Sequence, residues 1–332
     1  EMRMPIVSVD EERNVVMLGG KTTKERLPDW AGSRYYVENV FEALDSPGEW
    51  YLNRKTSTLY YWPLPGEEMT EADVVAPVFE HIIVFKGDVA SGKFVKNITF
   101  KGFTLAHCDW YLPKDGYSEG QASIFVHRQI AEERKLANLP TDPRSMGRPG
   151  GAISAVGARA CSLEDNHITH IGPYAVDLGL GCKNNRVTGN RFNDLGAGAI
   201  KIGPWGFSNK APSDIEEPTG NIFADNYVYD GGIVYLGAVG VWIGNCGGNI
   251  ISHNEVRDLN YTGISAGFIW GCANDNRGRD NIIEYNYIHH IARRMLNDGG
   301  GIYILGNSPG TIINNNLIHD VYTAGHLGRG IY

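Results

Sequence analysis

The stretches Asn249-Ile-Ile-Ser-His-Asn254 and Asn281-Ile-Ile-Glu-Tyr-Asn286 are two copies of one repeating unit. In each copy, two asparagines five residues apart enclose a short apolar run. The second asparagine aligns with others at intervals of 24 to 36 residues along the chain. These anchor positions are Asn166, Asn190, Asn226, Asn254, Asn286 and Asn316. A repeat of this length is typical of a solenoid, in which each coil stacks only on its neighbours.

The residues around each anchor indicate β-strands. An apolar residue follows two positions after the anchor and Asp or His four positions after it, as in Val256 and Asp258. A second block then has Gly or Ala followed by apolar–x–apolar, as in Gly240-Val-Trp-Ile243. Apolar positions that alternate with period two predict strands, and the 42 glycines disfavour a helical repeat. The sequence therefore predicts an all-β fold, a right-handed parallel β-helix.

The repeat does not extend over the whole chain. Residues 1–92 lack it, and residues 50–62 hold two aromatic-rich runs around a polar turn, a pattern typical of a β-hairpin. We expect residues 1–92 to form a small β domain or cap, because the open end of a solenoid exposes apolar faces and strand edges. Residues 93–332 are expected to form the β-helix. Since the sequence ends inside a repeat block, at Tyr332, we expect the β-helix to be truncated in mid-coil.

Composition and charge narrow the classes of partner. The formal net charge of −8 argues against nucleic acid and against an anionic membrane surface. No apolar run approaches the roughly 18 residues of a membrane span, and the first residues do not have the pattern of a signal peptide. The five cysteines form no Cys-x-x-Cys pair, so we predict no zinc or other metal site. Cys161 aligns with the first asparagine of the unit and is expected to be a buried thiol.

The distances between repeat blocks locate the insertions. They lie around 231–236, 292–298 and 322–328 before the strand of the second block, around 204–218 and 268–278 after it, and at 108–150. The insertions therefore flank one sheet on both sides. Because functional residues concentrate on loops held by a rigid scaffold, we interpret this sheet as the floor of a cleft. The alternative is that surface loops simply tolerate insertion.

Side chains on and around this sheet suit a carbohydrate. Sugars present C–H faces that stack on aromatic rings, and their hydroxyls need polar partners. The predicted substrate-binding residues are Trp242, Tyr303, Trp270, Tyr261, Lys201, His326 and Arg329. The expected partner is an oligo- or polysaccharide. For each aromatic residue, the alternative is a ladder that only stabilises the coils.

Two aspartates are the candidate catalytic groups. Glycoside hydrolysis uses a pair of carboxyl groups about 5–5.5 Å apart for retention or about 6.5–9.5 Å apart for inversion. Asp298 lies in an insertion before three glycines, which allow close approach of a substrate. Asp177 points outward from the sheet by period-two alternation. The alternatives are a turn aspartate for Asp298 and an ion pair with Lys201 for Asp177.

Two other functions compete with hydrolysis. A polysaccharide lyase would use Lys201 or Arg329 as its base and often Ca²⁺ to neutralise a uronate carboxylate. No Asp-x-Asp-x-Asp cluster is present for Ca²⁺, and a hydrolase of this kind needs no cofactor. The third reading is a non-catalytic β-helix that only binds glycans. The repeated aspartates at one coil corner, such as Asp194 and Asp258, are predicted to be structural because Asp caps turn amides.

Several stretches resemble right-handed β-helix enzymes that degrade glycans, most closely family 141 of the glycoside hydrolases and its uncharacterised relatives. They are residues 50–62, 103–110, 194–203, 238–244, 261–265, 286–291, 297–303 and 328–332. They follow one another in order over most of the chain. The activities of this group are diverse and include fucosidase- and xylanase-type reactions.

The resemblance implies a secreted or periplasmic glycoside hydrolase that acts on plant cell-wall or similar glycans. It also implies a carboxylate at Asp298. Relatives often have Ser-Asp-Met-Gly-Gly where this chain has Asn297-Asp-Gly-Gly-Gly301, so the aspartate is shared while its loop differs. In relatives a further acidic pair follows the motif that ends here at Tyr332. The resemblance therefore places the second catalytic carboxylate beyond this residue.

Overall fold

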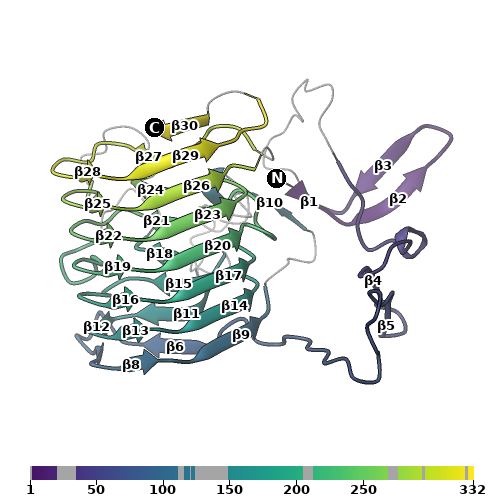
Figure 1. Ribbon diagram of the computed structural model, residues 1–332, viewed down its shortest axis with the longest axis horizontal. Coiled ribbons are helices and arrows are strands. Elements are labelled where there is room, and N and C mark those ends of the chain that lie inside the picture. The colour runs from purple at the N-terminus through teal and green to yellow at the C-terminus, as the bar shows by residue number, and fades with distance from the viewer. Residues whose placement is uncertain are drawn as a thin grey trace. The chain divides into compact units, whose positions relative to one another are not determined.

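The computed structural model of the 332-residue chain describes residues 2–20, 35–110, 116–119, 121–123, 149–204, 212–267, 276–293, 296–325 and 328–332. Its main body is a parallel β-helix of stacked coils, which Figure 1 shows from the side. Each full coil contributes one strand to each of three sheets. The predicted all-β, parallel β-helix is therefore confirmed.

Sheet 1 has eight strands and contains the second block of every repeat. Its strands, in chain order, are β6 (Ile83–Lys86), β11 (Gly151–Val156), β15 (Tyr174–Leu178), β18 (Ile200–Ile202), β21 (Val241–Ile243), β24 (Ile264–Gly267), β27 (Gly299–Leu305) and β30 (Gly328–Ile331). Successive strands pair in parallel, as in Trp242 with Ser265 and Ser265 with Tyr303. This is the sheet that the sequence predicts as the floor of a cleft.

Sheets 2 and 3 have seven strands each. The strands of sheet 2 lie between the two asparagines of the repeating unit, and those of sheet 3 follow the second asparagine. Sheet 2 contains β8 (Thr99–Lys101), β13 (Ser162–Glu164), β16 (Arg186–Thr188), β19 (Ile222–Ala224), β22 (Ile250–Ser252), β25 (Ile282–Glu284) and β28 (Ile312–Asn314). Sheet 3 contains β9 (Thr104–Cys108), β14 (His167–Ile171), β17 (Arg191–Leu195), β20 (Tyr227–Gly231), β23 (Glu255–Leu259), β26 (Tyr287–Ile291) and β29 (Leu317–Val321). A short parallel pair, β7 (Val95–Lys96) and β12 (Ala158–Arg159), precedes sheet 2 in its coils.

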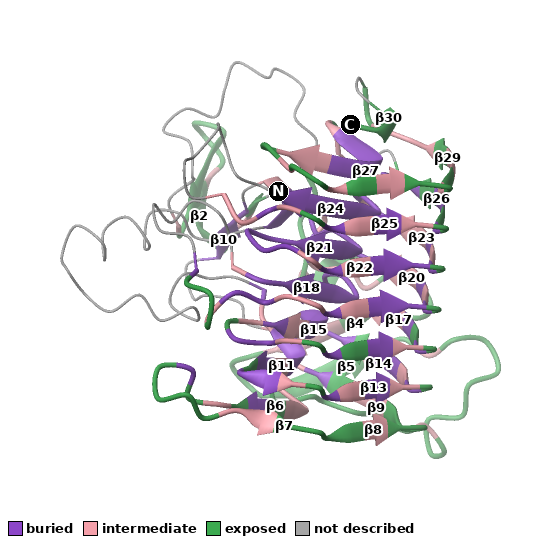
Figure 2. Cartoon of the chain, turned by 90° about the vertical axis from the view of Figure 1, so that its left-hand side faces the viewer, coloured by how far each residue is buried: buried purple, intermediate pink, exposed green. Residues whose placement is uncertain are grey.

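The core fills the inside of the coils. The apolar residue two positions after each anchor points inward, and Ile168, Phe192, Val228, Val256 and Ile288 are all fully buried. Figure 2 shows the buried residues running through the strands of successive coils. The period-two pattern of the sequence is thus the pattern of inward and outward side chains.

Two ladders of buried asparagines run along the corners of the coils. The side-chain amide of Asn226 donates to Oδ1 of Asn254 at 3.0 Å, and that of Asn254 donates to Oδ1 of Asn286 at 2.9 Å. The first asparagine of the unit forms a second ladder, in which Asn221 donates to Asn249 at 3.0 Å. These bonds satisfy polar groups that would otherwise be buried without partners. Cys161 is buried, as predicted, and its backbone N–H donates to Oδ1 of Asn185.

The repeated Asp and His residues also have a backbone role. Asp194, Asp258 and His290 have φ angles of 52°, 54° and 52°, in the left-handed region. Asp and Asn adopt this conformation more readily than most residues other than glycine, and His is enriched in it as well. The residue is the fourth of five in its strand of sheet 3 in each of these coils, so the repetition has a backbone role. The predicted capping of turn amides by these aspartates stays a prediction.

The chain divides into units at other positions than the sequence predicts. Residues Lys24–Ala76 form one compact unit, and Glu1–Thr23 with Pro77–Tyr332 form the other. The expected boundary between residues 92 and 93 is wrong, because β6 already pairs with β11 in sheet 1. Residues before 24 belong to the β-helix unit as well, since β1 (Met2–Arg3) pairs with β10 (Tyr117–Ser118). Neither β1 nor β6 carries the asparagine repeat, so the pattern could not assign them.

The smaller pieces are simple hairpins. In the β-helix unit, β2 (Ile6–Asp10) pairs with β3 (Val15–Leu18). In the unit Lys24–Ala76, β4 (Trp50–Asn53) pairs with β5 (Thr58–Tyr61), which confirms the predicted hairpin, and Phe41 of the 3₁₀ turn η1 (Phe41–Ala43) contacts rings of this hairpin. Within the described ranges, no helix is long and apolar enough to cross a membrane.

Candidate active site

Part of the insertion at 108–150 lies against sheet 1 and its loops. We call residues 116–119 and 121–123 the crossing segment. The Tyr117 hydroxyl donates to the carbonyl of Val234 at 2.8 Å, and the backbone N–H of Gly237 donates to Oε1 of Glu119 at 3.1 Å. Further along, Ala122 in the 3₁₀ turn η2 (Gln121–Ser123) packs with Val239, Trp242 and Tyr261. The segment thus runs from the loop before β21 to the loop before β27, where Gln121 contacts Asp298.

Asp298 lies where this segment meets the loop before β27. The side-chain amide of Gln121 donates to Oδ2 of Asp298 at 2.9 Å. The Tyr261 hydroxyl donates to the backbone carbonyl of Asp298 at 2.7 Å. Oδ1 of Asp298 is buried and has no hydrogen-bond partner within the described part of the chain. The φ angle of Asp298 is 59°, in the left-handed region that Asp and Asn adopt more readily than most other residues.

Two tyrosine hydroxyls lie beside this carboxylate. The amide nitrogen of Gln121 is 3.2 Å from the hydroxyl of Tyr261 and 3.3 Å from that of Tyr303. Burial raises the pKa of Tyr303 to about 12 and also raises the pKa of Tyr261. Both phenols are therefore protonated near neutral pH and can donate a hydrogen bond. The ring of Tyr332 meets Tyr303 edge-on, with the centroids 4.5 Å apart.

The structure brings only some of the predicted substrate-binding residues together. Tyr261 and Tyr303 border Asp298, and Arg329 of β30 lies beside Gly300, with its guanidinium 4.6 Å from the Tyr332 ring. Trp270 and His326 lie outside the described residues. Trp242 is only 2% exposed because it packs with Ala122 and Val239 under the crossing segment. The prediction of an open Trp242 platform on the sheet is therefore wrong for this structure.

Asp177 and Lys201 form an ion pair elsewhere on sheet 1. The Lys201 amino group is 3.0 Å from Oδ2 of Asp177, and it donates to the carbonyl of Pro149 at 2.8 Å. Asp177 lies on β15, and β18, β21 and β24 separate that strand from β27. At about 4.8 Å per strand, β15 and β27 are roughly 19 Å apart, more than a catalytic carboxylate pair allows. The structure thus contradicts the prediction of Asp177 as the partner of Asp298 and agrees with its alternative, the ion pair.

The sequence reasoning missed two polar residues of the crossing segment. Gln121 contacts Asp298, while Glu119 is buried and also accepts a hydrogen bond from the Ser123 hydroxyl at 2.6 Å. Both lie in the insertion at 108–150. The length of this insertion was the only feature of the sequence that marked the region as a candidate part of the site. Because the insertion lacks the repeat, no pattern showed which of its residues would reach the sheet.

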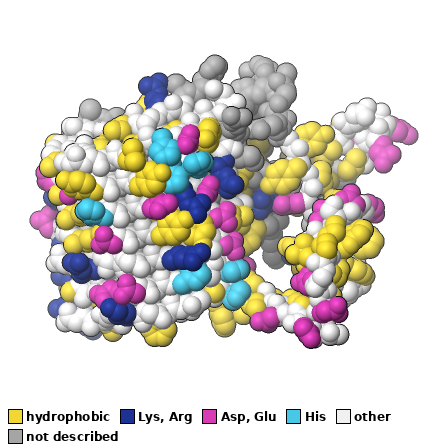
Figure 3. All heavy atoms as spheres, in the orientation of Figure 1, with side chains coloured by type: hydrophobic (Ala, Val, Ile, Leu, Met, Phe, Trp, Pro, Cys, Tyr) yellow, Lys and Arg dark blue, Asp and Glu magenta, His cyan; other side chains and the backbone are white. Residues whose placement is uncertain are grey.

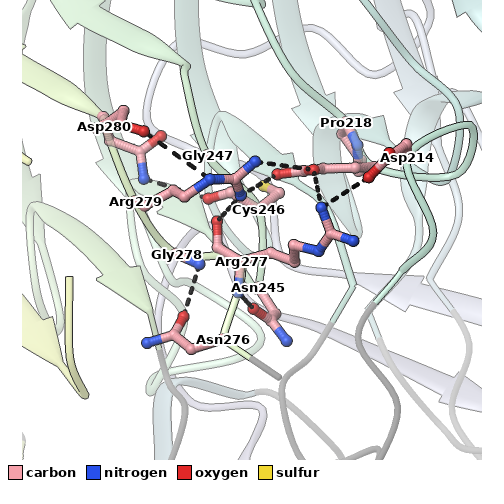
Figure 4. A network of polar contacts seen from close by, with 12 residues as sticks. Asp214, Pro218, Asn245, Cys246, Gly247, Asn276, Arg277, Gly278, Arg279 and Asp280 are labelled. Carbon is pink, nitrogen blue, oxygen red and sulfur yellow. Dashed lines mark hydrogen bonds and ion pairs between the residues drawn. The ribbon is translucent and has the colours of Figure 1, made fainter. Parts of the chain in front are cut away.

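A network of charged groups connects three loops that follow strands of sheet 1. Glu217 is 4% exposed and accepts hydrogen bonds from Arg277 at 3.2 Å and from Arg279 at 2.8 Å. Arg277 also donates to Asp214 through its side chain and to Oδ1 of Asn245 through its backbone. Figure 4 shows both arginine side chains directed at the stretch that holds Asp214 and Pro218. The network joins the ends of the insertions predicted at 204–218 and 268–278.

The comparisons with known proteins agree with the observed fold. A family model described as the right-handed β-helix region matches residues 152–331. The chain belongs to the right-handed β-helix family. Residues 26–64 of this β-helix protein match a second family model, the GH141 insertion domain. The predicted resemblance to β-helix proteins of family 141 is thereby confirmed.

The chain was also compared with solved structures and with curated proteins. A structure described as a glycoside hydrolase superposes on this β-helix protein with a TM-score of 0.75 and 28% sequence identity. The match covers 86% of this chain and 49% of the other, so the chain spans about half the length of that protein. No curated protein matches the chain.

Proposed function

We propose that this right-handed β-helix protein is a glycoside hydrolase that acts on a plant cell-wall or related glycan, with Asp298 as a catalytic carboxylate. The observation that carries the proposal is the meeting of Asp298, Tyr261, Tyr303 and Gln121 beside sheet 1. The match to the GH141 insertion domain and the similar glycoside hydrolase structure support it. A substrate outside the cell would place the protein in a secreted or periplasmic location.

The side chains around Asp298 have the chemistry that binding of a sugar requires. Oδ1 of Asp298 is buried and has no hydrogen-bond partner among the described residues, so these residues do not complete the hydrogen bonding of this carboxylate. The hydroxyl of Tyr261 already donates to the carbonyl of Asp298. The phenol of Tyr303 is protonated near neutral pH, and the ring of Tyr332 offers an apolar face to a sugar. Hydrolysis then requires a second carboxyl group across the bond, a role that Asp177 does not fill.

The contacts of Lys201 favour hydrolysis over lysis. A lyase needs a basic side chain free to remove a proton from a uronate ring. Lys201 instead holds Asp177 and the carbonyl of Pro149. Arg329 remains the other candidate base, and it stacks on Tyr332.

Replacing Asp298 tests the proposal. We expect Asp298→Asn to lower the hydrolysis of plant cell-wall polysaccharides, measured as reducing ends, by a factor of about 10²–10⁴. The matched control is Asp214→Asn, whose side chain is 91% exposed in the loop network. Hydrolysis that survives in Asp298→Asn would remove the proposed role. An ultraviolet-absorbing product would instead show a lyase, and binding without any product would show a glycan-binding protein.

A further inference from the structure

The outer face of sheet 1 is covered over four consecutive coils. Its outward side chains form one row along the sheet, in which Lys201 pairs with Trp242, Trp242 with Ser265 and Ser265 with Tyr303. These four residues are 9%, 2%, 0% and 4% exposed, in that order. In the first coil of the sheet, Val84 of the same row is 57% exposed. Figure 2 shows β18, β21 and β24 as buried (purple), so the row is not the floor of an open groove at these coils.

Both ends of the insertion at 108–150 contribute to this cover. Near its first end, Ala122 of the crossing segment packs on the side chain of Trp242. Near its second end, the carbonyl of Pro149 accepts a hydrogen bond from the Lys201 amino group at 2.8 Å. The apolar and polar side chains of the row are thus engaged by the protein itself, at positions where an open groove would present them to a ligand.

Contacts with several elements fix the crossing segment in place. Tyr117 is fully buried, its ring centroid lies 5.7 Å from that of Tyr235, and its strand β10 pairs with β1. The buried carboxylate of Glu119 accepts hydrogen bonds from the backbone N–H of Gly237 and from the Ser123 hydroxyl. Lifting the segment would expose this ring cluster to water and leave the N–H of Gly237 without its acceptor. The cover is therefore part of the folded protein.

The covered row limits the path of a glycan through the candidate active site. Strands about 4.8 Å apart place β18 and β27 roughly 14 Å apart. Asp298 lies in the loop before β27, at one end of this stretch. A glycan that ran along the sheet past Asp298 would need the face of β24, β21 and β18 for its sugar units, and the crossing segment occupies that face. A chain bound at Asp298 therefore stops there.

We propose that the crossing segment restricts hydrolysis to the ends of glycan chains. The enzyme then releases a terminal unit from a main chain or a side branch and does not cut within a chain. Each turnover consumes one water molecule, whose hydroxyl adds to the anomeric carbon while its proton goes to the leaving oxygen. This inference rests on the proposed hydrolase function.

The size of the products tests the inference. Arabinoxylan, xyloglucan and pectin serve as probes, each in soluble form and as a dyed, cross-linked gel. We expect the wild type to release mono- or disaccharides from a soluble probe and no dyed fragments from the gel, because a dyed fragment leaves the gel only after cuts within its chains. Dyed fragments, or a ladder of longer oligosaccharides at early times, would overturn the inference and leave the hydrolase proposal intact. No product from any probe would remove the hydrolase proposal itself.

A measurement without substrate tests the cover in solution. The fluorescence of Trp242 is obtained as the difference between the wild type and Trp242→Phe. We expect acrylamide to quench it several-fold less than it quenches N-acetyltryptophanamide, because the side chain is buried under Ala122. Equal quenching would show an open face at β21 and overturn the inference, whether or not a glycan is hydrolysed.

Glu119→Gln tests whether the crossing segment causes the restriction, because it weakens the hydrogen bonds to Gly237 and Ser123. The matched control is Glu11→Gln, which removes the same charge from an exposed turn of the β-helix unit. In Glu119→Gln, the release of dyed fragments should rise with the quenching of Trp242, whereas both should stay at wild-type values in Glu11→Gln. Release while Trp242 is protected, or exposure of Trp242 without release, would overturn the role of the segment.

Discussion

Gln121 donates a hydrogen bond to Asp298 at 2.9 Å, although 177 positions separate the two residues in the chain. Asp298 belongs to a loop of the repeat, whereas Gln121 belongs to an insertion without any repeat. The contact shows that the candidate site is not formed by the coils alone. It forms where the crossing segment meets the loop before β27.

The asparagine ladder should contribute strongly to stability. In Asn254→Ala, the N–H groups of Asn226 and the carbonyl of Phe223 lose their partner in a buried corner. An unsatisfied buried group costs about 1–3 kcal/mol, so we expect the free energy of unfolding to fall by about 3 kcal/mol. Urea denaturation measures the change. Asn316→Ala, in the last described coil and less buried, should cost about 1 kcal/mol. Equal losses would contradict the role of burial.

The Asp177–Lys201 pair should show energetic coupling. Lys201→Met leaves the carboxylate of Asp177 and the carbonyl of Pro149 without their partner, and we expect a loss of about 2 kcal/mol. Adding Asp177→Asn should recover part of that loss. A double-mutant cycle read by chemical denaturation gives the coupling free energy. A value near zero would mean that the pair is not stabilising.

The network around Glu217 should hold the loops after β18, β21 and β24. Glu217→Gln removes the negative charge that two arginines share, and we expect the free energy of unfolding to fall by about 2 kcal/mol. Asp214→Asn should cost well under 1 kcal/mol because that carboxylate is exposed to solvent. Hydrogen exchange of residues 276–280 should become faster in Glu217→Gln alone. If both variants behave alike, burial of Glu217 does not govern the network.

Stability should also depend on pH through the outer face of sheet 3, where Figure 3 shows histidine side chains gathered (cyan). Burial lowers the pKa of His289, whose ring stacks on His319. The folded state therefore favours neutral His289, while the unfolded chain binds a proton near pH 6.5. This contribution to stability is fully present above about pH 6.5 and is lost as the pH falls from there through the lower pKa of folded His289.

Thermal unfolding of wild type and His289→Gln at pH 7.5 and pH 5.5 checks the sign. The wild type should lose more stability than the variant over this interval. Between pH 7.5 and pH 9, the two proteins should change in parallel, because His289 does not titrate there. A larger acid-induced loss in the variant would contradict the assignment.

The coils could be predicted because their contacts repeat. Each asparagine unit meets a copy of itself on the next coil, so Asn254 and Val256 have the same environment as Asn226 and Val228. Strand positions, the buried face and the corner ladder follow from that local pattern. The same pattern placed Asp298 in a loop beside sheet 1. It could not include β6 or β1, which lack the repeat and belong to the β-helix unit only through their pairing.

The sequence by itself determined the parallel β-helix, its core and the sheet beside which Asp298 lies, because each coil contacts only its neighbours and the spacing of like residues records those contacts. The tertiary structure decided the surroundings of Asp298. It brought in Gln121, buried Trp242 under the crossing segment and paired Asp177 with Lys201. The path of the crossing segment depends on contacts with residues more than a hundred positions away, such as Val234 and Tyr303, and no local spacing records such contacts.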